Sequence, residues 1–318
     1  MSEKIRLGVS ACLLGERVRY DGQHKHDRFI TDTLGSFVEY VPVCPEVECG
    51  LPVPREAMRL VGSLESPRLM TQRTGVDLTE QMQSWAAKRI KELEKENLCG
   101  FIFKAKSPSS GMERVKVYNG RGGLTGFGSG MFARAFMEHF PLLPVEEEGR
   151  LHDPLLRENF IERVFTLQRY RDAITPRISL AGLTAFHAHH KYLLMSHNQE
   201  AVRRMGRMLA NAKRDGVALK DLAAGYEEDL LKTLKLIATP RKHVNVLQHM
   251  AGYLKEQLAA DEKKELAELL AEFKQGLIPL IVPVTIINHY VRKYQPEYLK
   301  DQVYLQPHPL ELQLRNHS

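Results

Sequence analysis

The stretch I-R-L-G-V-S-A-C-L-L-G, residues 5–15, is a strand-like segment that runs into a cysteine and a glycine. Two segments of the same kind follow: residues 37–43 run into Cys44, and residues 100–106 run into Ser107. Parallel strands joined by helices bring their carboxyl ends to one edge of a sheet, where α/β proteins build their sites. The sequence therefore predicts an α/β fold whose crevice gathers thiols, a carboxylate and hydroxyls.

Around these segments, strand-like and helix-like stretches alternate over residues 1–172, which is typical of a Rossmann-like domain with a mostly parallel sheet. Residues 79–97 carry a threonine cap and apolar side chains at helical spacing, which predicts an amphipathic crossover helix. Residues 115–118 predict a short strand. The glycine-rich residues 120–130 predict a mobile loop near the crevice mouth.

A last strand after Phe140 and a helix over residues 154–171 complete the predicted α/β domain, and residues 173–179 predict a linker. Beyond the linker, apolar residues recur at helical spacing, so we expect residues 180–318 to form an all-α domain. The predicted helices of this domain include residues 219–237, residues 244–258, and a third that is capped by Asp261 and stopped by Gly276.

The composition is that of an ordinary soluble protein: 318 residues, 43% hydrophobic and 26% charged, with a mean hydropathy of -0.32. The first six residues are charged and lead into a strand, unlike a secretory signal. The longest nearly apolar run, residues 277–287, contains two prolines and is shorter than the ~20 residues that span a bilayer. We therefore expect a cytoplasmic protein that does not bind membranes.

The four cysteines do not predict disulfides, because a cytoplasmic compartment keeps thiols reduced. Cys99 precedes its strand, so we expect it to be a buried thiol at the opposite edge of the sheet. Cys12, Cys44 and Cys49 follow strands, which favours a site over simple packing. A zinc site would show a C-x-x-C pair or a close Cys/His set, and neither is present. Three thiolates from separate loops suit a 4Fe–4S cluster with one open iron, which is a Lewis acid.

Oxygen-bearing side chains join the thiols in the predicted crevice. Glu46 lies within the cysteine-rich segment, where its carboxylate could activate a water. Ser107, Ser109 and Ser110 follow the third strand. They either donate protons and hydrogen bonds to a substrate or form a simple turn with Pro108.

Five motifs of the first half, taken in order, resemble the TudS-like thiouracil desulfurases. They are V-S-A-C-L-L-G (residues 9–15), V-R-Y-D-G (18–22), C-P-E (44–46), G-L-P-V-P-R (50–55) and S-P-S-S-G (107–111). The second half resembles the YbgA-like domain in F-H-A-H-H-K-Y-L-L-M (186–195), H-V-N-V-L-Q-H (243–249) and P-L-I-V-P (279–283). The fusion of the two resembles the RudS-like tRNA 4-thiouridine desulfidases.

This resemblance implies a non-redox hydrolysis of a thiocarbonyl, in which the sulfur binds the open iron and leaves as hydrosulfide. It assigns water activation to Glu46 and proton transfer to Ser107. The predicted substrate contacts are Tyr20, Arg55, Lys106, Ser109 and Ser110, and the predicted cluster ligands are Cys12, Cys44 and Cys49.

The chain departs from the family pattern at one position. Family members usually carry S-P-S-C-G where this chain has Ser110, so the usual third thiolate is absent and Cys49 is the predicted substitute. If Cys49 points away from the crevice, the cluster would be labile or would use the oxygen of Ser110.

Charge favours an anionic partner for the second half. Residues 1–172 hold 25 Lys and Arg against 24 Asp and Glu, and the remaining residues hold 20 against 15. Together with the resemblance, this predicts tRNA as the partner, with no obligate protein partner. The predicted RNA contacts are His187, Lys191, Arg203, Arg204, Arg207, Lys213, Arg214, Arg241 and Lys242. Basic pairs are also compatible with a solvated surface, and the histidines with metal binding or packing.

Two other functions are compatible with the sequence. The same chemistry could act on a free thiolated base or nucleoside, although such a substrate needs no second domain. Alternatively, a structural or regulatory cluster would make the chain an RNA-binding or redox-sensing protein. Glu46 separates these functions, because a sensor has no use for a carboxylate beside an open iron.

Overall fold

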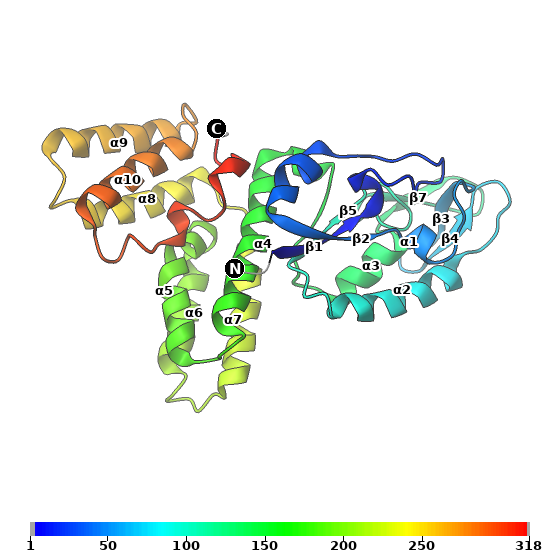
Figure 1. Cartoon of the computed structure of the whole chain (residues 1–318), viewed down its shortest axis with the longest axis horizontal. Helices are drawn as coiled ribbons and strands as arrows, with labels where there is room; N and C mark the ends of the chain where they lie inside the picture. Colours follow the sequence, from blue (N-terminus) through cyan, green and yellow to red (C-terminus); the bar gives the residue numbers. More distant parts are fainter. Residues whose placement is uncertain (1–3, 317–318) are drawn as a thin grey trace. The chain divides into compact units, whose positions relative to one another are not determined.

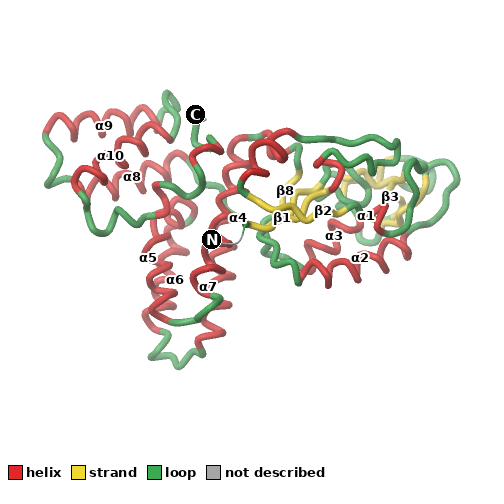
Figure 2. The backbone as a smooth tube through the Cα atoms, viewed as in Figure 1, coloured by secondary structure: helices red, strands yellow, loops and turns green. Residues whose placement is uncertain are grey.

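The computed structural model describes residues 4–316, and the chain divides into two compact units, Met1–Asp153 and Pro154–Ser318 (Figure 1). The strands belong to the first unit, and the described part of the second unit is built from helices, turns and loops (Figure 2). The predicted combination of an α/β domain and an all-α domain is confirmed. No helix within residues 4–316 is long and apolar enough to cross a membrane.

A four-stranded parallel sheet organises the first unit. Its strand order is β2 (Val38–Val43), β1 (Ile5–Ser10), β5 (Gly100–Phe103) and β8 (Val145–Glu147). Gly8 is required in β1, because a Cβ atom there would lie 2.1 Å from the ring of Phe101 on the adjacent strand. The segments that follow β1, β2 and β5 therefore start at one edge of the sheet, as predicted.

Aromatic packing fixes β5 and the loop that follows it. The rings of Phe101 and Phe103 stack at 4.3 Å between centroids, and Phe132 and Phe136 of helix α3 (Met131–His139) pack against them. Such rings each bury about 150–250 Å² and prefer these offset and edge-to-face arrangements. Cys99 is fully buried just before β5, as the sequence predicted.

The predicted crossover helix is α2 (Thr79–Glu94), which packs beside α3. Thr79 is its first residue rather than its cap, because Leu78 occupies the N-cap position. The Thr79 hydroxyl instead accepts a hydrogen bond from the backbone N–H of Leu69 at 2.9 Å, which ties the helix to strand β4 (Pro67–Thr71).

A second sheet, which the sequence did not predict, has the order β4 (Pro67–Thr71), β3 (Met58–Gly62), β6 (Val115–Tyr118) and β7 (Leu124–Gly128). β3 and β6 are parallel, while β4 and β7 pair antiparallel at the two edges. The prediction of a mobile loop over residues 120–130 is wrong at β7. Main-chain pairing with β6 needs no large side chains, so glycine does not prevent it here.

Short elements complete the first unit. They are α1 (Pro45–Glu48), the 3-10 helices η1 (Ala11–Leu14), η3 (Leu34–Ser36) and η4 (Arg150–His152), and the π-helix η2 (Phe29–Thr33). η1 and α1 directly follow β1 and β2, so they orient the first and second cysteine-bearing segments.

The second unit is a helical assembly around one apolar core. Its elements are α4 (Pro154–Ile174), α5 (Leu180–His197), α6 (Gln199–Asn211), α7 (Leu219–Leu234), α8 (Pro240–Leu254), α9 (Ala260–Lys274), α10 (Ile281–Tyr294), η5 (Val303–Leu305) and η6 (Leu310–Leu312). α7 and α8 both end before the predicted helices do. Asp261 does not cap α9, because Ala259 is the N-cap and its N–H donates to the Glu262 carboxylate at 2.8 Å.

Helix α4 belongs to this helical unit. Tyr170 and Ile174 join its core, and the Tyr170 hydroxyl donates to the carbonyl of Ala223 on α7 at 2.7 Å. The predicted boundary near residue 172 therefore falls inside the second unit, and residues 173–179 span the end of α4 and the turn before α5.

Candidate active site

A cavity of about 320 Å³ opens where β1, β2 and β5 end. The carboxyl end of each strand contributes to the wall: Ser10 at the end of β1 with Ala11 and Cys12 after it, Cys44–Glu46 after β2, and residues 104–110 after β5. A fourth stretch around Tyr20, together with Lys25 and Arg55, completes the lining. The strand-end rule thus brings together the thiols, carboxylate and hydroxyls that the sequence selected.

Glu46 is the best-held side chain of the cavity. Two nitrogens of Arg55, Nε at 2.8 Å and Nη2, donate hydrogen bonds to Glu46 Oε2. The Ser109 hydroxyl donates to Oε1 at 2.8 Å. The Arg55 guanidinium is 5% exposed and also donates to the carbonyl of Val18 at 2.9 Å. Two arginine nitrogens on one carboxylate oxygen and a hydroxyl on the other fix the carboxylate in one orientation, as a proton acceptor requires.

The three predicted serines lie in one turn, and the hydroxyls of two of them, Ser107 and Ser109, form a hydrogen-bond chain. The backbone N–H of Gly111 donates to the Ser107 carbonyl at 2.8 Å, which closes the turn. The Ser107 and Ser109 hydroxyls lie 3.0 Å apart, and Ser109 reaches Glu46. The segment is therefore both a turn and a source of hydroxyl hydrogen bonds, the two roles that the sequence left open. Ser109, rather than Ser107, makes the direct contact with the carboxylate.

Cys12 and Cys44 both line the cavity. Burial raises the pKa of the Cys12 thiol to about 12, against the nearby positive charge of Lys104, which lowers it. Burial also raises the pKa of Cys44. A metal at this site would therefore have to displace protons from both thiols when it binds.

Cys49 lies elsewhere. It follows α1 as the C-cap residue, and its thiol donates to the backbone carbonyl of Glu46 at 3.3 Å. Its side chain packs against the apolar cluster around Met58 and Leu60, and it is not among the residues that line the cavity. Its predicted role as the third ligand stays a prediction that this geometry does not favour.

Ser110 provides the third donor atom inside the cavity. The residue is 4% exposed and lines the cavity, and within residues 4–316 its hydroxyl has no hydrogen-bond partner. Because Ser110 lines the cavity, a ligand bound there would give this hydroxyl a partner. The donor set of two thiols and one hydroxyl fits an iron–sulfur cluster held by Cys12, Cys44 and Ser110. Described residues include no group of three or more His, Cys, Asp or Glu side chains that is suited to a metal ion.

Sequence reasoning missed three cations in the lining: Arg19, Lys25 and Lys104. Lys104 follows β5 directly, so the strand-end rule could have found it. Its backbone N–H donates to the Ser10 hydroxyl at 2.9 Å, and its ammonium group pairs with Glu148 and donates to the carbonyl of Ala105 at 3.0 Å. These cations make the cavity attractive to anionic ligands.

The predicted substrate contacts all lie in the cavity wall. Tyr20 and Lys106 are both exposed, and the Arg19 guanidinium carbon lies 5.4 Å from the centroid of the Tyr20 ring. Arg55 is already engaged by Glu46, so the structure gives it a positioning role whether or not it touches a substrate.

The predicted RNA contacts of the helical unit fall into two groups. Several are engaged within the protein: His187 contacts the Tyr226 hydroxyl at 3.1 Å, Lys242 donates to the carbonyl of His197, and Arg204 pairs with Asp229. Arg214 pairs with its neighbour Asp215, and the Lys191 ammonium lies 6.0 Å from the Tyr298 ring centroid. The side chains that stay exposed without an ion pair among the described residues are Arg203, Arg207, Lys213 and Arg241.

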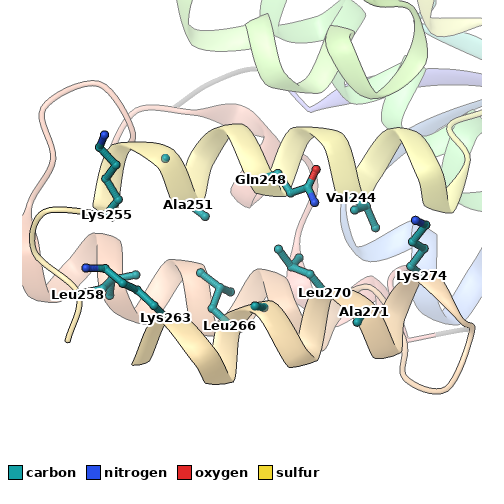
Figure 3. A pocket seen from close by; sticks show the side chains of 12 residues that line it. Val244, Gln248, Ala251, Lys255, Leu258, Lys263, Leu266, Leu270, Ala271 and Lys274 are labelled. Atoms are coloured by element: carbon teal, nitrogen blue, oxygen red, sulfur yellow. The ribbon is translucent and has the colours of Figure 1, made fainter. Parts of the chain in front are cut away.

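The helical unit also contains an apolar groove of about 460 Å³ between α8 and α9 (Figure 3). Leu266 and Leu270 of α9 face Val244 and Ala251 of α8, and lysines stand at both ends. Its lining holds no thiol, carboxylate or histidine, so the groove offers none of the groups that the cavity of the first unit provides for chemistry.

Comparisons with known proteins follow the division into two units. The family model described as 2-thiouracil desulfurase matches residues 7–148. The uncharacterized protein YbbK of Bacillus subtilis is 32% identical over 117 residues, which are 35% of this chain and 76% of that protein. The chain belongs to the 2-thiouracil desulfurase family.

The second unit has its own relatives. A family model described as a protein of unknown function (DUF1722) matches residues 191–309. The uncharacterized protein YbgA of Escherichia coli is 28% identical over 154 residues, which are 48% of this chain and 90% of that protein. The chain is thus a 2-thiouracil desulfurase domain joined to a YbgA-like domain, as the motifs predicted.

Among solved structures, the chain is similar to a [4Fe-4S]-dependent thiouracil desulfidase, TudS. The identity is 32%, the TM-score is 0.39, and the match covers 47% of this chain and 95% of that one. Membership of the 2-thiouracil desulfurase family supports a thiouracil-type substrate for this cavity.

Proposed function

We propose that this desulfurase converts 4-thiouridine in tRNA into uridine and releases hydrosulfide, with a 4Fe–4S cluster as its cofactor. The observation that carries the proposal is Glu46, held by Arg55 and Ser109 in a cavity that Cys12 and Cys44 also line. The similarity to a [4Fe-4S]-dependent thiouracil desulfidase supports the choice of cofactor.

The overall reaction replaces the thiocarbonyl sulfur by a water oxygen and transfers no electrons. Cys12, Cys44 and the oxygen of Ser110 would hold the cluster, which supplies a Lewis-acidic iron for the sulfur. Glu46 takes the proton of the attacking water, because its carboxylate is fixed by charge-assisted hydrogen bonds and lies in the same cavity.

The serine chain moves the proton onward. Ser109 donates to Glu46 Oε1, and the Ser107 hydroxyl lies 3.0 Å from that of Ser109. A proton that arrives on the carboxylate can therefore be exchanged along the two hydroxyls toward the base. Lys104, Lys106 and Arg19 line the cavity and stabilise the negative charge that develops at the reacting carbon and the leaving sulfur.

A stacked base in folded tRNA cannot reach a cavity of this kind, so the nucleotide has to be extruded. The second unit supports RNA as the substrate, because a free base would need no such unit. Arg203 and Arg207 are one helical turn apart on α6 and are exposed, which suits contacts with phosphate groups.

The proposal is tested with protein prepared without oxygen and loaded with iron and sulfide. The absorbance of the thiocarbonyl is followed in bulk tRNA and in free 4-thiouracil. Loss of the band in tRNA supports the proposal, and a band that persists in tRNA while it disappears in 4-thiouracil would restrict the enzyme to free bases. If neither band disappears although the cluster is loaded, the cluster serves a sensor or structural role.

The third ligand is tested with Cys49→Ala, Ser110→Ala and Ser110→Cys. We expect Ser110→Ala to load less iron, Ser110→Cys to hold the cluster longer in air, and Cys49→Ala to resemble the unaltered chain. Iron content and the visible absorbance of the cluster are the measurements, so the result does not depend on turnover. Iron loss in Cys49→Ala alone would instead assign the third position to Cys49.

A further inference from the structure

The second sheet of the α/β unit presents one face of cations and aromatic rings. Along β6, Val115 and Val117 are buried while Lys116 and Tyr118 alternate with them on the other face. Phe127 of β7 pairs directly opposite Lys116 and is 53% exposed. Because side chains of paired residues lie on the same face of a sheet, Phe127 and Lys116 form one surface.

The neighbouring strand extends this surface. Arg59 of β3 precedes Leu60, which pairs with Val117 and is buried, so Arg59 lies on the same face as Lys116 and Tyr118. The Arg59 guanidinium carbon is 5.6 Å from the Tyr118 ring centroid, as in a cation–π pair. The buried Nε of Arg59 has no hydrogen-bond partner among the described residues.

A groove of about 700 Å³ begins on this face and adjoins the active site. Its lining includes Arg59, Lys116, Tyr118 and Phe127, and it shares Lys106 and Pro108 with the cavity of Cys12 and Glu46. The cavity and the groove are therefore adjacent spaces with part of their wall in common.

The groove carries an excess of positive charge. Its lining holds five Lys and Arg side chains and two carboxylates, Glu113 and Glu147. Both carboxylates are engaged, because Glu113 pairs with Arg150 at 2.8 Å and Glu147 accepts the N–H of Met112 at 2.7 Å. Within residues 4–316, no ion pair joins the side chains of Arg59, Lys106, Arg114 or Lys116 to a carboxylate.

We propose that this groove binds the RNA nucleotide next to the thiolated one, with its base on Phe127 and Tyr118 and its phosphate between Lys116 and Arg114. Exposed aromatic rings on a sheet stack bases, and neighbouring cations hold phosphates, in many proteins that bind single-stranded RNA. The inference rests on the proposed desulfuration of RNA and locates a recognition surface within the catalytic unit itself.

Lys106 links the two spaces. Its backbone lies in the left-handed region, at φ 61°, which is uncommon for a residue with a side chain. The residue borders both the cavity and the groove, so its ammonium group is placed to hold the phosphate that joins the extruded nucleotide to its neighbour. A free thiolated base has no such phosphate and gains nothing from the groove.

The first test measures binding without any cluster chemistry. Fluorescently labelled, unmodified U-U-U is titrated with the full chain, and anisotropy is followed at several salt concentrations. We expect Phe127→Ala to weaken binding about tenfold, and Lys116→Ala to weaken it and to reduce the salt slope by about one. The matched control is Lys88→Ala, because Lys88 is exposed on α2 and lines neither space.

Two binding results would overturn the proposal. One is equal affinity for U-U-U in Phe127→Ala, Lys116→Ala and Lys88→Ala. The other is competition by a glutamate-rich peptide of the same charge as effectively as by unlabelled U-U-U, which would show that the groove recognises acidic chains rather than bases.

The second test uses the loaded enzyme and compares 4-thiouridine with a trinucleotide that carries it in the middle. The two groove variants are expected to lower kcat/KM about tenfold for the trinucleotide and to leave the nucleoside unchanged. Equal losses on both substrates would contradict the groove. If the unaltered enzyme desulfurates neither these two substrates nor tRNA, the proposed function fails, while the anisotropy result still decides whether the groove binds RNA.

Discussion

Each unit of the molecule contains ion pairs with little exposure to solvent, but only those of the α/β unit lie at the active-site cavity. In the α/β unit, Arg55 holds Glu46 and Lys104 pairs with Glu148, and Arg55, Glu46 and Lys104 all line the cavity. In the helical unit, Arg315 donates to Glu158 at 3.0 Å, and His197 contacts Glu162 at 2.6 Å. Arg315 and His197 are 3% and 2% exposed.

In the helical unit, the buried charged side chains pair with one another: Arg315 lies beside both Glu158 and Glu162, and Glu162 also contacts His197. Burial raises the pKa of Glu158 to about 7, against the charge of Arg315. For Glu162, burial is outweighed by His197 and Arg315, which lower its pKa to about 2. Strongly shifted carboxylates are often taken as markers of function. Here the largest carboxylate pKa shifts belong to this buried network, which lines no part of the cavity, so access to a cavity is the better guide to the site.

Removing the charge of Glu46 should have the largest effect. Glu46→Gln keeps the shape of the side chain but cannot accept a proton, so we expect the kcat of desulfuration to fall about 10²–10⁴-fold. The measurement is the rate of thiocarbonyl loss in tRNA by protein loaded with iron. Glu16→Gln, an exposed carboxylate outside the cavity lining, is the control. Comparable rates in the two variants would remove Glu46 from the mechanism.

Breaking the helical network should cost stability in one unit only. Arg315→Met leaves Glu158 and Glu162 buried without their guanidinium, which we expect to cost about 3–5 kcal/mol. Thermal unfolding of the helices, followed by far-UV circular dichroism, should therefore begin at a lower temperature than in the unaltered chain. Trp85, the single tryptophan, lies in the α/β unit, so the unfolding transition followed by its fluorescence should not shift.

The control for this variant is Lys264→Met, because Lys264 and its partner Glu268 are both exposed. A shift of the tryptophan transition as large as that of the helices would show that the network supports the whole chain rather than one unit.

A smaller effect on turnover is expected from the hydroxyl that orients Glu46. Ser109→Ala removes a hydrogen bond to a charged group, a loss of about 1.5–3 kcal/mol, or roughly 10–100-fold in rate. Ser63→Ala serves as the control, because Ser63 is exposed in the loop after β3. A fall as deep as that of Glu46→Gln would mean that Ser109 transfers a proton itself instead of only orienting the carboxylate.

The smallest expected effect is a dependence of the stability of the helical unit on acidic pH. The pKa of Glu162 is depressed in the folded chain, so its contribution to stability is present above its ordinary value of 4.5 and is lost as pH falls toward 2. Denaturant midpoints of the helices, measured from pH 6 to about pH 2.5, should fall less steeply in Glu162→Gln than in Glu268→Gln. Parallel curves would assign the acid sensitivity of the unit to other groups.

The sequence predicted the elements that carry the strongest patterns. β1 has the expected bounds, 5–10, because a strand-like segment followed by a cysteine and a glycine is distinctive. Cys12, Cys44, Glu46 and the serines converge because strand ends share an edge, which follows from topology alone.

Strand β6 was predicted with its observed bounds, 115–118, but the second sheet as a whole was missed because its strands are short and half-exposed. β7 contains two glycines and reads as a loop, while its pairing depends on β6 being in place. The orientation of Cys49 is likewise beyond sequence reasoning. Whether a thiol after a one-turn helix faces the cavity or the apolar cluster depends on how α1 packs, and not on the spacing of cysteines.

The packing of α4 determines where the chain can be recombined. A transplantable helical cassette would begin at Pro154, well before residue 191, where the match to the YbgA-like family begins. A chimera cut at Leu180 would lose Tyr170 and Ile174 from its core and the hydrogen bond to Ala223. Asp153 is therefore the splice point at which this helical cassette could be joined to an unrelated carrier protein.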